Sequence, residues 1–260
     1  MKLVIVILLV IFITSLSQFE EVFLDDFNGN SLDTSQWSIL DFSTDYDPRN
    51  LQLYMRDNVE VRNGHLIITT RRETTLGPDN KLYNFTSGSI SGKNLLSYYQ
   101  GKFIVRAKLP PLSATGAWPA YKLLPQSHQC WPTGGEIDIM EATCGHKKGY
   151  HVIGSYKKGT QCGATHEFSP GASYPPVGSP GIDWSKDFHE FSVEWGEGYM
   201  VYSVDDIVYH TVLASEVHFP NAPMYFVLNT AVAWYMPPGE YASYPATHVI
   251  DWVKVVQFIE

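Results

Sequence analysis

The fold class is decided by the stretch Val59-Glu60-Val61-Arg62-Asn63-Gly64-His65-Leu66-Ile67-Ile68-Thr69-Thr70. Two runs rich in β-branched and apolar residues flank Asn63-Gly64. Asn-Gly favours the tight turn of a two-residue hairpin, because both residues tolerate positive φ. The stretch therefore predicts a β-hairpin.

Similar alternating runs recur along the chain and end at Pro, Gly or paired Asp residues. They lie at residues 103–109, 188–195, 199–204, 207–211 and 249–259. Helical spacing with caps is nearly absent, and Ser31–Trp37 is the best candidate for a short turn. Many short strands with such punctuation predict an all-β domain, a sandwich or a barrel.

The N-terminus has the pattern of a secretory signal peptide. Met1-Lys2 precedes an apolar run at residues 3–13, and the small residues Ser15 and Ser17 then occupy the −3 and −1 positions of a cleavage site. The run is shorter than the roughly 20 apolar residues that cross a bilayer, and no later stretch is long enough for an anchor. A buried N-terminal strand is the alternative. We expect cleavage after Ser17, an extracellular protein, and a single domain over residues 18–260.

The charge favours an uncharged partner. The formal net charge is −9 and the calculated pI is near 5.4, which argues against nucleic acid. Many Tyr and Trp residues lie among turn residues, where flat rings with a polar edge suit the faces of sugars, although most aromatic residues in any domain belong to its core. We expect a monomer that binds a neutral polymer.

Three cysteines follow the signal segment, an odd number. Cys130 and Cys162 lie nearly equidistant from the turn of a second expected hairpin, formed by residues 136–142 and 151–156. This favours a Cys130–Cys162 disulfide, with Cys144 left over; three reduced thiols are the alternative. Asn84-Phe85-Thr86 is an N-glycosylation acceptor triplet.

The stretch that carries chemistry is Trp131-Pro132-Thr133-Gly134-Gly135-Glu136-Ile137-Asp138-Ile139-Met140-Glu141-Ala142. Side chains alternate along a strand, so Glu136 and Asp138 share one face. Strict alternation would send Glu141 into the core, where an unpaired charge costs several kcal/mol. A β-bulge at about Ile139–Met140 would turn Met140 inward and return Glu141 to the acidic face.

Three clustered carboxylates suit acid–base chemistry. With the bulge, the backbones of Glu136 and Glu141 lie about 13 Å apart, and leaning side chains can close this to about 5–5.5 Å. Mutual repulsion, with Asp138 between them, should raise at least one pKa, as a general acid requires. The alternatives are an acidic ladder on a solvated sheet, although no opposite charges interleave within this stretch, or a Ca²⁺ site.

The stretch Gly135–Glu141 resembles family-sixteen glycoside hydrolases of the laminarinase branch, which are endo-1,3-β-glucanases. Further matches span nearly all of the chain after the signal segment; they lie at Gly101-Lys102-Phe103, Arg106–Pro110, Trp118-Pro119-Ala120, Phe188–Trp195 and Asp251–Val255. The resemblance implies a β-jelly-roll sandwich with a concave substrate cleft. It implies Glu136 as nucleophile, Glu141 as acid/base and Asp138 as an assisting residue.

The chain departs from that pattern at two lysine positions. Lys122 stands where laminarinases commonly have the second Trp of Trp-Pro-Ala-x-Trp, and Lys157-Lys158 where relatives often have His or Trp. Residues four apart on a strand share a face, so Lys122 should follow Trp118 toward the cleft. We expect these lysines to be solvated at the cleft rim; contact with an anionic glycan is the alternative.

The expected activity is retaining endo-hydrolysis of β-1,3-glucan, with mixed-linkage β-1,3-1,4-glucan as a further candidate substrate. We expect Trp118, Lys122, Trp131 and Trp234 to contact the polysaccharide. Catalysis needs no cofactor, and the resemblance leaves a structural Ca²⁺ as a candidate. The alternatives are a non-catalytic β-glucan recognition protein, and a transglycosylase or hydrolase of the same fold that acts on another polysaccharide.

Overall fold

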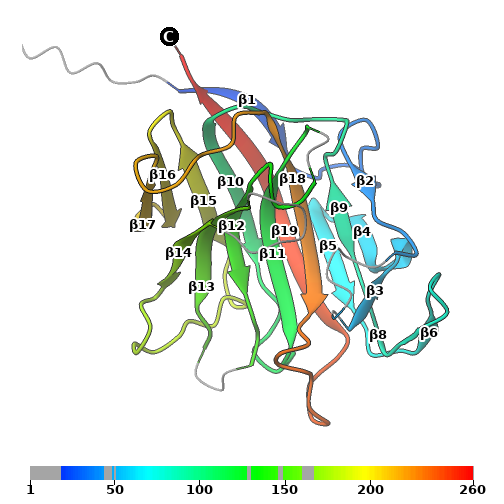
Figure 1. The fold of residues 1–260 in the computed structure, drawn as a ribbon. Helices are drawn as coiled ribbons and strands as arrows, with labels where there is room; N and C mark the ends of the chain where they lie inside the picture. The colour runs from blue at the N-terminus through cyan, green and yellow to red at the C-terminus, as the bar shows by residue number, and fades with distance from the viewer. Residues whose placement is uncertain are drawn as a thin grey trace, which may run out of the picture.

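The computed structural model describes residues 19–43, 49, 51–127, 130–145, 149–159 and 167–259. Its strands form two large sheets that lie one behind the other (Figure 1). The expected signal segment, residues 1–17, lies outside the described residues, and so does Cys162. No helix in the described part of the chain is long and apolar enough to span a membrane.

The larger sheet has eight strands and includes both ends of the described chain. Its order is β17 (Ile207–Leu213), β16 (Tyr199–Val204), β15 (His189–Trp195), β10 (Gly101–Lys108), β19 (Ala246–Phe258), β5 (His65–Thr70) and β4 (Val59–Arg62), with β1 (Phe19–Asp25) also paired to β19.

The smaller sheet has seven strands and carries the acidic stretch near its middle. Its order is β14 (Glu167–Tyr174), β13 (Val152–Lys158), β12 (Glu136–Ala142), β11 (Ala117–Pro125), β18 (Met224–Val232), β9 (Ser89–Ser91) and β2 (Ser38–Ile39). The remaining elements are the pairs β3 (Gln52–Tyr54) with β8 (Phe85–Ser87) and β6 (Thr75–Leu76) with β7 (Leu82–Tyr83), and the 3₁₀ helix η1 (Arg56–Asn58).

The hairpin predicted from the Asn-Gly pair is confirmed. β4 and β5 pair antiparallel with Arg62 opposite His65. Asn63 and Gly64 have φ of 54° and 74°, the left-handed conformation that the turn requires. The other predicted strands are also present, as β10, β15, β16, β17 and β19, and a turn lies within Ser31–Trp37.

The core lies between the two sheets and is rich in aromatic side chains. Phe103 of β10 packs edge-to-face on Phe226 of β18, with ring centroids 5.6 Å apart. Tyr121 of β11 meets Phe191 of β15 at 5.8 Å. All four are fully buried, and each such side chain contributes about 2–3 kcal/mol through burial of apolar area. These contacts join the sheets face to face, which confirms the predicted all-β sandwich.

A buried histidine adds a polar link between the sheets. His248 of β19 is fully buried, with Nε2 2.5 Å from the Tyr121 hydroxyl and Nδ1 3.0 Å from Thr230 Oγ1. Burial lowers the pKa of His248 to about 3. The imidazole is therefore neutral at ordinary pH, and it aligns β19 with β11 and β18 without a buried charge.

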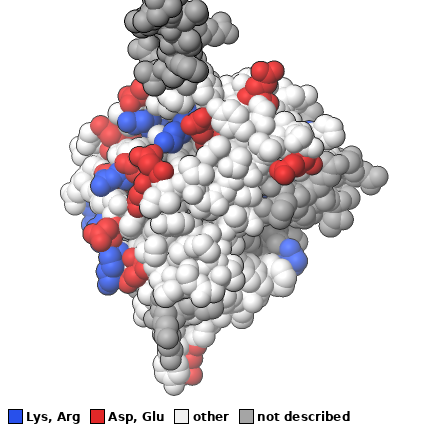
Figure 2. Space-filling model, turned by 90° about the vertical axis from the view of Figure 1, so that its left-hand side faces the viewer, with Lys and Arg blue, Asp and Glu red and all other residues white. Residues whose placement is uncertain are grey.

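The surface charge is mixed. Figure 2 shows acidic and basic side chains side by side along one border of the molecule and a broad uncharged area beside them. No continuous basic area appears on this face.

Candidate active site

The acidic stretch forms a bulged strand, as predicted. The pairing of β12 with β13 shifts register between Asp138 and Glu141. Ile139 and Met140 both belong to the buried core, so two successive side chains point inward. The extra residue returns Glu141 to the face of Asp138, because it resets the alternation.

Gly135 is required where the chain enters β12. Its φ is +89°, and a Cβ atom there would lie 2.8 Å from the Tyr156 hydroxyl oxygen. Glycine alone meets both conditions without strain. The backbone therefore reaches Glu136 with the carboxylate directed to the same face as those of Asp138 and Glu141, because all three contact one shared cation, Lys122 Nζ.

Two lysines lie among the three carboxylates. Lys122 Nζ is 3.0 Å from Glu136 Oε1, 3.3 Å from Glu141 Oε1 and 3.9 Å from Asp138 Oδ1. Lys157 Nζ is 2.7 Å from Asp138 Oδ2, 3.3 Å from Glu141 Oε2 and 3.8 Å from Glu136 Oε1. Each ammonium therefore lies within 4 Å of all three carboxylates.

The expectation that these lysines are solvated at the cleft rim is wrong. Only 20% of the side chain of Lys122, and of Lys157, is exposed. Both point into the carboxylate cluster because they stand on the strands that flank β12, with Lys122 opposite Asp138 and Lys157 opposite Glu136. The opposite charges that β12 lacks along its own sequence come from its neighbours.

The lysines decide which carboxylates are ionised. Burial alone would raise the pKa values of Glu136 and Glu141, but the ammonium groups of Lys122 and Lys157 outweigh it and lower both. The pKa of Asp138 instead rises to about 8, because of its burial and its repulsion by Glu141. A raised pKa was predicted for at least one member, and it occurs on the central residue.

Two further side chains hold the cluster. The Ser155 hydroxyl donates to Asp138 Oδ2 over 2.8 Å, and the Trp131 indole N–H donates to Glu136 Oε2. Trp131 thus lies at the carboxylate cluster, and its expected contact with the polysaccharide stays a prediction. The sequence analysis did not predict a role for Ser155. The register of the β12–β13 hairpin places Ser155 opposite Asp138, so only a correct register would have identified it.

An aromatic row extends from the lysines. The Lys122 ammonium lies 6.0 Å from the centre of the Trp118 ring, which confirms that these two side chains share a face. Tyr235 packs edge-on against Trp118 at 5.2 Å and against Trp234 at 5.7 Å. Trp234 is therefore connected to the site through Tyr235, a residue that the sequence analysis did not identify. The guanidinium carbon of Arg49 lies 4.2 Å from the centre of the Trp234 ring.

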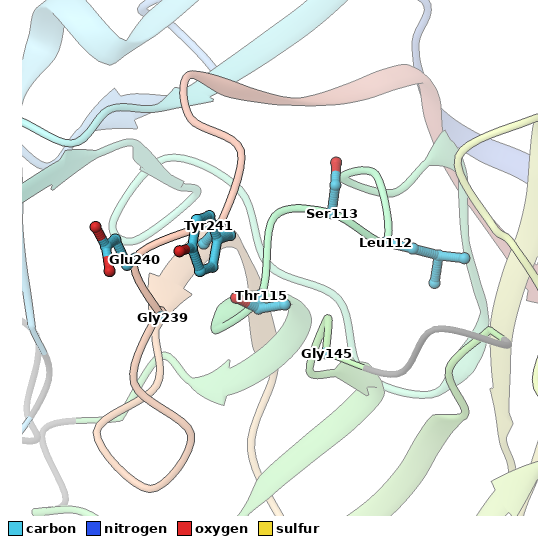
Figure 3. Close-up of a pocket in the computed structure, with 8 residues that line it drawn as sticks. Leu112, Ser113, Thr115, Gly145, Gly239, Glu240 and Tyr241 are labelled. Carbon is cyan, nitrogen blue, oxygen red and sulfur yellow. The ribbon is translucent and has the colours of Figure 1, made fainter.

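A separate pocket opens between the loop that follows β18 and the segment before β11 (Figure 3). Tyr241 and Glu240 come from the first, and Ser113 and Thr115 from the second. None of the three β12 carboxylates lines it. The hollow is thus distinct from the charged cluster.

Among the described residues, the His, Cys, Asp and Glu side chains form no candidate metal site. Within the described ranges, no three His, Cys, Asp or Glu residues lie close enough to hold an ion. The carboxylates of β12 already have lysine partners, which would compete with a cation. The structural Ca²⁺ thus remains an untested expectation.

The expected disulfide and glycan also remain predictions. Cys144 is a buried free thiol, in keeping with its expected place outside the bridge, and Cys162 is not described. Burial raises the pKa of Cys144 to about 12, so the thiol is unreactive at neutral pH. Asn84 is exposed, as a glycosylated residue must be.

Comparison with known proteins identifies the relatives. The model of glycosyl hydrolases family 16 matches residues 48–254. The chain is 30% identical to glucan endo-1,3-beta-glucosidase A1 of Niallia circulans over 90% of its own length but only 37% of that protein's. It is 28% identical to the beta-glucanase of Rhodothermus marinus, over 93% of the chain and 86% of the relative.

A solved structure gives the same result. The catalytic domain of an endo-1,3-beta-glucanase (laminarinase) from Thermotoga petrophila RKU-1 superposes with a TM-score of 0.82 at 28% identity. The match covers 94% of this chain and all of the other. Fold and sequence therefore agree over the described sandwich.

Proposed function

Because the chain belongs to glycosyl hydrolase family 16, we propose that it is a secreted, retaining endo-β-1,3-glucanase. Mixed-linkage β-1,3-1,4-glucan is a second proposed substrate. Glu136 is the nucleophile, Glu141 the acid/base and Asp138 the assisting residue. The relatives named above support the substrate, since two of the three are named as 1,3-β-glucan hydrolases.

The observation that carries the proposal is the closeness of the two glutamates. Glu136 Oε1 and Glu141 Oε1 lie 3.0 Å and 3.3 Å from one nitrogen, Lys122 Nζ, so they are at most about 6.3 Å apart, the sum of the two distances. Retaining glycosidases place their carboxyl groups about 5–5.5 Å apart, whereas inverting enzymes need about 6.5–9.5 Å to admit a water. The short separation supports retention.

The reaction then takes two steps. A Glu136 oxygen forms a bond to the anomeric carbon while the bond to the leaving oxygen breaks, and Glu141 protonates that oxygen. Glu141 next removes a proton from water, which displaces Glu136 from the glycosyl-enzyme. The low pKa of Glu136 suits a nucleophile, because the carboxylate is ionised over the working range.

The aromatic side chains provide surface for the sugar chain. Trp131 is 41% exposed and Trp234 39%, on rings that also contact the site. We propose that these two rings and Trp118 stack on glucosyl units, where each contact contributes about 1 kcal/mol, by analogy with other aromatic contacts. An exposed ring keeps its apolar face available to a ligand.

The test is the release of reducing ends from laminarin, lichenan, agarose and carrageenan by the secreted protein. We expect release from laminarin, less from lichenan, and none from the two galactans. Proton NMR of the first laminarin product should show the β-anomer. An initial α-anomer would overturn the retaining assignment, and release from a galactan alone would overturn the substrate. Products longer than the donor would indicate transglycosylation.

A second candidate is a β-glucan-binding protein that hydrolyses very slowly. The observation that favours it is the pairing of every β12 carboxylate with two lysines, which opposes protonation of Glu141. Calorimetric binding of laminarin, without reducing ends at any pH between 4 and 8, would support this candidate over the first.

A further inference from the structure

Lys122 and Lys157 approach the acidic strand from opposite sides. Lys122 stands on β11, opposite Asp138, and Lys157 stands on β13, opposite Glu136. Antiparallel neighbours in these positions direct their side chains to the same face of the sheet. The two ammonium groups therefore enclose the carboxylates from both flanks.

Both lysines lie equally close to Glu141. Its Oε1 lies 3.3 Å from Lys122 Nζ and its Oε2 lies 3.3 Å from Lys157 Nζ. A different cation thus contacts each of its two oxygens. A carboxylic acid carries its proton on one of these oxygens, so protonation there competes directly with an ion pair.

Three other titratable groups face Glu141, and together with the lysines they set the net charge of the cluster. Glu136 and Asp138 face it from its own strand, and Tyr235 faces it from the segment after β18. With one proton on Asp138, two carboxylates balance two ammonium groups. Asp138 Oδ1 and Glu141 Oε1 are both buried without a hydrogen-bond partner among the described residues. Of the two residues, only Asp138 has a raised pKa, so the proton belongs on Asp138.

We propose that Lys122 and Lys157 are positioning residues that hold Glu141 by both oxygens, so that one ion pair must break before Glu141 protonates a leaving oxygen. The inference rests on the proposed role of Glu141 as acid/base. In the first step the bond to Glu136 forms, the glycosidic bond breaks, and the leaving oxygen takes the proton from Glu141. In the second step Glu141 accepts a proton from water, which the two ion pairs also oppose, so the first step is tested separately through kcat/KM.

Two kinds of substrate separate these steps. Cleavage of laminarin needs a proton on the leaving oxygen, whereas a 2,4-dinitrophenyl β-glucoside of a laminari-oligosaccharide departs without one. We expect the wild-type protein to lose kcat/KM on laminarin as the pH rises, at a lower pH than it loses activity on the aryl glycoside. The gap between the two profiles measures the hindrance to proton donation.

The variants are Lys122→Met and Lys157→Met, which keep side-chain length and remove the charge. Removal of an opposite charge at this distance should move the alkaline limb of the laminarin profile up by about one pH unit or more. Lys122→Arg keeps the charge and should leave the limb near its wild-type position. Lys158→Met is the matched control, because Lys158 contacts the Phe219 carbonyl oxygen at 3.4 Å and no carboxylate in the described structure.

A ¹³C-carboxylate NMR titration of Glu141 tests the same point without turnover. In Lys122→Met its resonance should titrate at higher pH than in the wild type, and thermal unfolding checks that each variant is folded. Unchanged titration and an unmoved alkaline limb in both methionine variants would overturn the inference while the proposed function stands. A wild-type protein that turns over neither substrate, with Glu141 titrating as expected, would overturn the proposed function alone.

Discussion

Two lysine–carboxylate pairs in this molecule have the same nitrogen–oxygen distance, but the carboxylate is exposed in one and buried in the other. On the eight-stranded sheet, Lys102 Nζ lies 3.0 Å from Asp206 Oδ1, with 25% and 81% of the two side chains exposed. On the seven-stranded sheet, Lys122 Nζ lies 3.0 Å from Glu136 Oε1, with 20% and 5% exposed. The difference between them is the solvent around the carboxylate.

That difference determines what each pair can do. Water screens the surface pair, and such pairs contribute about 0–1 kcal/mol to stability. The buried carboxylate has lost its water, so the nearby cation governs whether it is ionised. Distance alone therefore does not identify a functional ion pair, and burial of the acid is the better guide.

The largest expected effect comes from removing the buried charge. Glu136→Gln should lower kcat on laminarin by about 10³-fold or more, because an amide cannot attack the anomeric carbon. Asp206→Asn removes the equivalent surface charge and should leave kcat unchanged. Steady-state kinetics of both variants decide, and retention of more than a few per cent of kcat by Glu136→Gln would contradict the nucleophile assignment.

Removal of the lysine charge should destabilise the protein more at the buried pair than at the surface pair. Lys122→Met leaves buried carboxylates short of a partner and should lower the free energy of unfolding at pH 7 by about 3 kcal/mol. Lys102→Met should cost less than about 1 kcal/mol. Urea denaturation measures both. Equal losses would mean that water penetrates the cluster and that the two environments are alike.

Asp138 should give the cluster a pH dependence that the surface pair lacks. Its folded pKa is near 8 against an ordinary value of 3.8, so the folded state holds a proton that the unfolded state releases. Its contribution to stability is complete below pH 3.8 and is lost as the pH rises to about 8, with a slope of at most about 1.4 kcal/mol per unit. The free energy of unfolding of Asp138→Asn, measured between pH 5 and 8, should fall less steeply than that of the wild type. Parallel curves would refute the raised pKa.

The smallest expected effect concerns the hydrogen bond from Trp131 to Glu136. Trp131→Phe keeps most of the ring and removes one charge-assisted hydrogen bond, so kcat should fall by about tenfold. Trp234 has ring contacts with Tyr235 and Arg49, and Trp234→Phe should change KM more than kcat. If both variants change only KM, the indole N–H of Trp131 does not orient the Glu136 carboxylate for attack.

Particular residues show how far sequence reasoning reaches. The Asn63-Gly64 hairpin and the bulge at Met140 were predicted, because turn chemistry and side-chain alternation are local properties. The position of Lys122 on the face of Trp118 followed from the same alternation. Its surroundings did not, since a lysine in a sequence carries no sign of whether its ammonium meets water or carboxylates.

The sequence by itself determined the all-β class and the acidic face of β12, because each depends on periodicity, and its motifs indicated the family and with it the sandwich. Only the tertiary structure decided that strands β11 and β13 bring one lysine each to that face, and that Asp138 rather than a glutamate has the raised pKa. The register between strands sets these contacts, and register depends on the packing of both sheets. Charges that lie far apart along the chain then share one buried site, where their Coulomb interactions are strong because water is excluded.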